Sequence, residues 1–101
     1  MAYIMVIAKQ HPHHAVEGGK VFASGKLGKL PDFVKLLHVF LNADFKIMSY
    51  ALYQVEDDKY FEGMKAIVNR YTPYFDVEGY EYKLVPLIEI KDALGMVGLG
   101  S

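Results

Sequence analysis

The sequence predicts an α+β fold in which a four-stranded antiparallel sheet carries two helices on one face. Strand-like and helix-like hydrophobic periods alternate along the chain in the order β-α-β-β-α-β. Only a few residues separate the two middle strands, so we expect these strands to form a hairpin. The chain has 101 residues, the size of one domain. We place this domain at residues 1–95 and expect a flexible C-terminal tail at residues 96–101.

The first strand is expected over Ala2–Gln10, where apolar residues occupy both side-chain parities, as in a strand buried on two faces. Pro12 lacks the amide hydrogen that a ladder needs, and it ends the strand. Residues 13–30 carry a weak helical stripe, but four glycines oppose it. A helix in that stretch therefore depends on packing more than on propensity.

The hairpin strands are expected over Phe33–Asn42 and Phe45–Val55, joined by a short turn. The clearest helix is Asp58–Tyr71, whose apolar side chains fall on one stripe. Asp57 or Asp58 is expected to cap this helix at its start.

The last strand is expected over Tyr80–Ile90. It contains Pro86, which favours a position at the edge of the sheet or a bulge. A short helical turn is expected over residues 91–95.

Composition excludes several classes of protein. The chain has no cysteine, which removes disulfides, thiolate catalysis and cysteine-based zinc sites. The net charge of −1 argues against a nucleic-acid partner bound through a broad basic field. No apolar run reaches 18 residues and no signal peptide precedes the first strand, so we expect no membrane partner and a cytoplasmic location.

Apolar side chains on the predicted open face of the sheet indicate a homodimer. The chain is 52% hydrophobic, and a folded monomer of its mass should expose only about 5,800 Å². In the third strand Tyr50 and Leu52 fall on the parity opposite to the small residues Ser49 and Ala51. An apolar band on the open face would exceed what monomers tolerate, and a two-fold dimer would cover it. The alternative is a monomer with an irregular open face.

The order of elements, the small size and the two-sided strands resemble the dimeric α+β barrel superfamily of ferredoxin-like proteins. The string His11-Pro12-His13-His14 and the segment Val77–Tyr82 are similar to an uncharacterised small-protein branch of it. The resemblance covers about residues 2–90 and implies a ferredoxin-like βαββαβ domain that dimerises as an α+β barrel. The superfamily includes antibiotic-biosynthesis-type monooxygenases and muconolactone-isomerase-like enzymes. No catalytic position of a characterised member matches, so none is carried over.

Three of the four histidines, His11, His13 and His14, lie within four residues. Imidazole binds metals and titrates near neutrality, so a zinc, nickel, copper or haem-iron site is one interpretation. Adjacent residues seldom chelate one metal in good geometry, and neither a cysteine nor a clear carboxylate partner accompanies them. We therefore assign no metal ligand and interpret the string as a polar loop, keeping His11 and His13 as weak candidates for ligand binding.

His38 is a lone histidine in an apolar strand, on the same parity as Val34 and Leu36. It is either a packed histidine with one hydrogen-bonded nitrogen or a general base facing a barrel interior, with Tyr50 or Gln54 nearby. His38 and Tyr50 are the weak catalytic candidates. These two and Gln54 are also candidates for ligand binding.

The chain has eight tyrosines, a side chain that suits interfaces and aromatic pockets alike. An aromatic group gathers around the last helix–strand connection: Tyr71, Tyr74, Phe75, Tyr80 and Tyr82. It predicts a packed corner of the core or, as an alternative, a pocket for a planar ligand.

Three functions follow from these features. The first is a homodimer that binds a small apolar or aromatic ligand. The second is a cofactor-independent or haem-linked monooxygenase, or an isomerase, of the same architecture. The third is a structural interaction module. The sequence identifies neither a cofactor nor a substrate.

Overall fold

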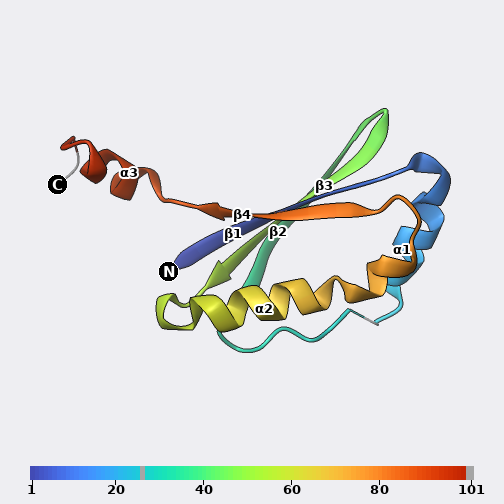
Figure 1. The fold of residues 1–101 in the computed structure, drawn as a ribbon, viewed down its shortest axis with the longest axis horizontal. Coiled ribbons are helices and arrows are strands. Elements are labelled where there is room, and N and C mark those ends of the chain that lie inside the picture. Colours follow the sequence, from blue (N-terminus) through green and yellow to red (C-terminus); the bar gives the residue numbers. More distant parts are fainter. Residues whose placement is uncertain (26, 100–101) are drawn as a thin grey trace.

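The computed structural model describes residues 1–25 and 27–99. A four-stranded sheet forms one layer, and two helices, α1 and α2, lie together on one side of it (Figure 1). The elements follow the order β1 (Ala2–Gln10), α1 (Ala15–Ala23), β2 (Val34–Asp44), β3 (Lys46–Val55), α2 (Tyr60–Arg70), β4 (Glu81–Leu87) and α3 (Ile90–Met96).

The sheet has the strand order β2-β3-β1-β4, and all three pairings are antiparallel. The prediction of an α+β fold with a four-stranded antiparallel sheet is therefore confirmed. β4 lies at an edge, as Pro86 predicts, because an edge strand can leave one side of its backbone unpaired. α3 follows β4 where a short helical turn was expected over residues 91–95, and it is slightly longer, spanning Ile90–Met96.

The two faces of β1 differ in burial. Ile4, Val6 and Ala8 point to the helices and are buried, whereas Tyr3, Met5 and Ile7 on the other face are only half-buried. We name the helix side of the sheet the covered face and the other side the open face. The expectation of a strand buried equally on both faces is thus wrong for this chain by itself.

A β-bulge in β2 changes which residues share a face. The register shifts between Leu36 and His38, so that Val34 and Leu36 lie on the covered face while His38 and Phe40 pair with open-face residues of β3. Simple alternation placed His38 with Val34 and Leu36, and that assignment is wrong. A bulge inserts one residue and inverts the parity of everything that follows it.

The hairpin turn is tighter than expected. β2 continues through Asp44, which pairs with Lys46, so that Phe45 alone forms the turn with a φ of 61°. The side chain of Phe45 is 99% exposed. An aromatic residue in a left-handed conformation at a fully exposed turn is uncommon, because Cβ crowds the backbone there.

The start of α2 is capped differently from the prediction. A 3₁₀ turn over Asp57–Lys59 precedes α2, and no side chain caps either element. Asp57 instead accepts a 2.9 Å hydrogen bond from the N-terminal ammonium of Met1. Both acidic residues still lie in the first turn, where the helix dipole favours negative charge.

The core lies between the covered face and α2. Ile4, Val55 and Ile67 are almost completely buried, together with Tyr53. Gly63 of α2 faces β3 so closely that an added Cβ would collide with Val55. Glycine at this position therefore sets the distance between helix and sheet.

The helix expected over residues 13–30 is shorter in the structure. A 3₁₀ turn over Pro12–His14 leads into α1, which ends at Ala23. Gly25 follows with a φ of 75°, a conformation that stops a helix. The glycines thus limit α1 to nine residues.

α3 projects from the end of β4, away from the rest of the molecule (Figure 1). The residues expected in a tail divide in two: Met96 ends α3 and residues 97–99 close it, whereas Gly100 and Ser101 lie outside the described residues. None of the helices in the described parts of the chain is long and apolar enough to cross a bilayer.

Candidate functional site

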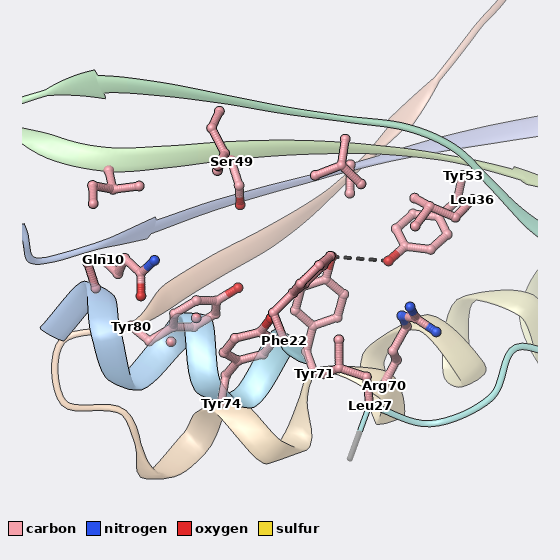
Figure 2. Close-up of a pocket in the computed structure, with 17 residues that line it drawn as sticks. Gln10, Phe22, Leu27, Leu36, Ser49, Tyr53, Arg70, Tyr71, Tyr74 and Tyr80 are labelled. Carbon is pink, nitrogen blue, oxygen red and sulfur yellow. Dashed lines mark hydrogen bonds between the residues drawn. The ribbon is translucent and has the colours of Figure 1, made fainter. Parts of the chain in front are cut away.

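A cavity of about 310 Å³ lies between the covered face and the helical layer (Figure 2). β3 supplies its floor, with Ile47, Ser49 and Ala51 in alternate positions. These side chains are small at the centre of the strand, and the space above them is not filled by α1. The small residues thus leave room for a ligand.

Tyrosines form the wall of the cavity beside the end of α2 and the 3₁₀ helix that follows it (Thr72–Asp76). The hydroxyls of Tyr53 and Tyr71 are hydrogen-bonded at 3.1 Å, and both are buried. The rings of Tyr74 and Tyr80 stack with their centroids 4.3 Å apart, and Tyr71 stacks on Tyr82 at 5.1 Å. The four tyrosines of the predicted aromatic corner therefore pack in or against the core, and Tyr71, Tyr74 and Tyr80 also line the cavity. Phe75, the fifth residue of that group, is 67% exposed and lies outside the corner.

Burial keeps these phenols protonated. Desolvation raises the pKa of Tyr71 and of Tyr80 far above the ordinary value, and neighbouring tyrosines raise it further. Desolvation also raises the pKa of Tyr74, although the nearby Arg70 partly opposes that effect. The three hydroxyls are thus neutral hydrogen-bonding groups at physiological pH and cannot serve as ready general bases.

Polar groups mark the two ends of the cavity. Figure 2 shows Gln10 beside Tyr80 at one end and Arg70 at the other. The buried Oε1 of Gln10 receives no hydrogen bond from the described residues. The Nη1 of Arg70 donates a 2.8 Å hydrogen bond to the carbonyl oxygen of Gly28, which orients the guanidinium.

Arg70 is the one ionised side chain among the described residues that line the cavity, and no carboxylate accompanies it there. The rest of the lining is apolar, aromatic or neutral. This chemistry suits a small molecule with an apolar body and few polar groups.

The histidine string lies outside the cavity. His11 and His13 stack with ring centroids 5.4 Å apart, directly after β1. His14 contacts Glu17 at 3.3 Å through Nδ1 and Glu78 at 3.8 Å through Nε2. Among the described residues, no three His, Asp or Glu side chains gather closely enough to hold a metal ion.

The other candidates from the sequence lie together on the open face. His38 stacks on Phe40 with centroids 5.7 Å apart, and Phe40 pairs with Tyr50 across the strands. Gln54 lies further along β3, where its Nε2 donates a 3.1 Å hydrogen bond to the hydroxyl of Tyr3. The structure thus brings His38, Tyr50 and Gln54 to one face of the sheet, on the side opposite to the cavity.

The residues at the ends of the cavity were not predicted. Gln10 ends a strand and Arg70 ends a helix, and neither position differs in sequence from an ordinary surface residue. One signal was available, since Arg70 directly precedes the tyrosine group that begins at Tyr71.

The comparisons with known proteins give little. No protein-family model matches the chain, and no curated protein matches it. Among solved structures it is similar to a tripeptidase from Staphylococcus aureus subsp. aureus Mu50, with a TM-score of 0.46 and 11% identity. That alignment covers 98% of this chain and 36% of the tripeptidase, so the chain spans about a third of that protein. A likeness this distant carries no argument about fold or function.

Proposed function

We propose that this protein is a ferredoxin-like homodimer, a small α+β barrel, that binds a small apolar or aromatic ligand in the cavity between its sheet and its helices. The observation that carries the proposal is the lined cavity itself. Its volume of about 310 Å³ lies at the lower end of the range for small-molecule sites, about 300–1,000 Å³.

The charge of the lining supports a ligand that carries an acidic group. Arg70 is the single cation of the lining, and a guanidinium pairs well with a carboxylate in a partly desolvated site. Gln10 adds a neutral polar side chain at the other end, although its Oε1 is itself buried against Gly18. A two-ring aromatic acid combines these features with a planar body for the tyrosine wall.

The test is a titration with two naphthalene probes, 2-naphthoic acid and its neutral counterpart 2-naphthalenemethanol, followed by ring fluorescence and by amide chemical shifts. We expect both probes to shift residues of the cavity, among them Ser49 and Phe22, and the acid to bind about tenfold more tightly. Arg70→Gln should remove the preference for the acid, whereas Lys65→Gln, on α2 outside the cavity, should keep it. Ser49→Leu should weaken both probes by filling the floor.

The outcomes are separable. Binding of neither probe, or shifts confined to the open face, would contradict a ligand site in the cavity. Equal binding of both probes to the wild type would leave the site in place and remove the role of Arg70.

The dimer rests on a second observation. The accessible surface is 6934 Å², about 1,100 Å² more than mass scaling gives for a compact monomer. A protomer in a standard interface buries about 800 Å². The open face supplies apolar surface for that burial, with Tyr3, Met5 and Ile7 half-buried in the single chain. Pairing of two open faces would form the barrel.

The alternative of a monooxygenase or isomerase gives His38 and Tyr50 acid–base roles. Both residues lie on the open face, so a site that uses them would have to form between two subunits. None of the four histidines lines the cavity, and burial raises the pKa of Tyr71 and Tyr80 in its lining, which makes them poor general bases. Binding without chemistry is therefore the function that the cavity supports best.

A further inference from the structure

The C-terminal segment of residues 88–99, which we name the arm, is a built element without a partner in the chain. Ile90, Ala93, Leu94 and Val97 recur at the spacing of one face of α3, and Met96 lies off that stripe. Gly98, with a φ of 74°, closes the helix: its amide donates to Gly95, and the Leu99 amide donates to Leu94 at 2.9 Å. This pair of bonds is a Schellman cap, which terminates α3.

The apolar residues of the arm are left in solvent. Five of these residues are each 62–75% exposed: Ile88, Ile90, Met96, Val97 and Leu99. None of the described arm residues belongs to the core or packs against it. The backbone hydrogen bonds of α3 and its cap run within the arm. An isolated helix of seven residues is unstable in water, so this helix needs a surface to cover its apolar stripe.

The shape of the molecule agrees with an unpaired arm. The radius of gyration is 15.4 Å, against about 13 Å for a compact chain of 100 residues. The longest dimension is 49 Å and the shortest 17 Å, and the arm lies at one end of the long axis in Figure 1.

A second exposed apolar surface lies at the opposite end of the sheet. It consists of Phe40, on the open face of β2, and Phe45, at the tip of the β2–β3 hairpin, and we name it the hairpin patch. Phe40 is 60% exposed and Phe45 is almost entirely exposed. The arm begins beyond Leu87, which pairs with Tyr3 at the start of β1. Phe45 lies beyond the other end of β1, whereas Phe40 lies level with Ile7 of β1 through their common partner Tyr50.

We propose that the arm of one protomer packs on the hairpin patch of a second copy of this chain. The proposal rests on the dimer proposed above. When two open faces pair about a two-fold axis that crosses the strands, the strands of the two sheets run in opposite directions. The arm end of one protomer then lies at the hairpin end of the other, on the side of β4, and the arm reaches the hairpin patch by crossing the end of the sheet toward β2. The contact occurs twice. The arm extends the interface beyond the paired faces and accounts for the large exposed surface of the single chain.

Cross-linking tests the proposal directly, because the chain has no cysteine of its own. Two single-cysteine variants, Leu94→Cys in the arm and Phe45→Cys in the hairpin patch, are mixed, allowed to exchange subunits and treated with a short bismaleimide. We expect a covalent heterodimer, identified by mass spectrometry. Lys65→Cys, on α2 and away from both surfaces, should give no product with Leu94→Cys.

A second measurement does not depend on cross-linking. The double variant Ile90→Ser with Leu94→Ser removes apolar side chains from the stripe of α3 and should raise the dimer dissociation constant by about 100-fold or more. Lys91→Ser, on the same helix but off the stripe, should leave the dimer dissociation constant unchanged. The core contains none of these residues, so the domain stays folded, which far-ultraviolet circular dichroism checks.

The failures are distinguishable. A wild-type protein that sediments as a monomer contradicts the dimer and the arm together. A wild-type dimer in which only arm-to-arm products form, or in which the double serine variant dimerises normally, overturns the arm and leaves the dimer standing.

Discussion

The two faces of the sheet carry similar amounts of apolar side chain but differ in what covers them. On the covered face, Ile4, Val6 and Tyr53 are almost completely buried under α2 and the tyrosine corner. On the open face, Ile7, Tyr50 and Leu52 have the same character and remain half-buried. One chain therefore covers only one face of its own sheet. The experiments below test whether the two faces differ in this way.

The largest effect on stability is expected from isoleucine substitutions on opposite faces of β1. Ile4→Ala opens a void in a closed core and should lower the free energy of unfolding by about 2–5 kcal/mol at any protein concentration. Ile7→Ala should cost less than half as much when the protein is dilute, and more as concentration rises, because the dimer covers Ile7. Urea unfolding at two concentrations a hundredfold apart measures both. Equal, concentration-independent losses would show that the faces are equivalent.

A smaller effect is expected where α2 approaches the covered face. Gly63→Ala places a Cβ against Val55 and 3.3 Å from Val34 Cγ2, so the helix has to move outward. We expect a loss of about 1–3 kcal/mol, even though alanine favours a helix. Gly19→Ala is the matched control, because nothing lies within 4 Å of its added Cβ. Thermal unfolding distinguishes the two, and a stable Gly63→Ala protein would contradict the close packing.

The next largest effect is expected at alkaline pH, where the buried tyrosines should make the folded protein less stable. Burial raises the pKa of Tyr71, Tyr74 and Tyr80 in the folded state, whereas an unfolded tyrosine ionises near pH 10. The unfolded chain therefore binds fewer protons above about pH 10, so stability is full below that pH and falls as the pH rises. Urea unfolding between pH 8 and 11 checks this, and Tyr80→Phe should flatten the fall. A fall of the same steepness in that variant would argue against the burial of Tyr80.

The smallest effect is expected from a charge pair that spans β1 and β4. Lys9 and Glu81 approach to 3.3 Å, and both side chains are exposed. Solvent screens such a pair, so Lys9→Ala should change stability by less than about 1 kcal/mol. A larger loss would mean that something covers this corner in the dimer. Addition of 1 M salt should reduce the effect further, which thermal unfolding can follow.

The hydrophobic periodicity of the sequence predicted most helices and strands, because the packing of these elements follows local patterns. β1 has the expected bounds, and α2 lies within the expected helix. The pattern failed where one residue breaks the repeat. The bulge between Leu36 and His38 inverts the faces of β2, and the single-residue turn at Phe45 extends β2 to Asp44 and moves the start of β3 to Lys46. Neither feature has a glycine or proline to reveal it in the sequence.

The site was harder to predict than the fold. The side-chain chemistry of histidine and tyrosine favoured His38 and Tyr50 as site residues, but the bulge and the register place both on the open face. The cavity depends instead on an absence of volume above Ser49 and Ala51. Small residues in a strand are equally compatible with a helix that approaches closely. Only the positions of α1 and the tyrosines decide between filled and empty space.

The most direct test of the account is the subunit mass by sedimentation velocity, measured over a range of protein concentrations. The account predicts a dimer of twice the 11.4 kDa chain at micromolar concentration, which dissociates on dilution. A particle of 11.4 kDa at every concentration would contradict it, because the open face would then be stable without any cover.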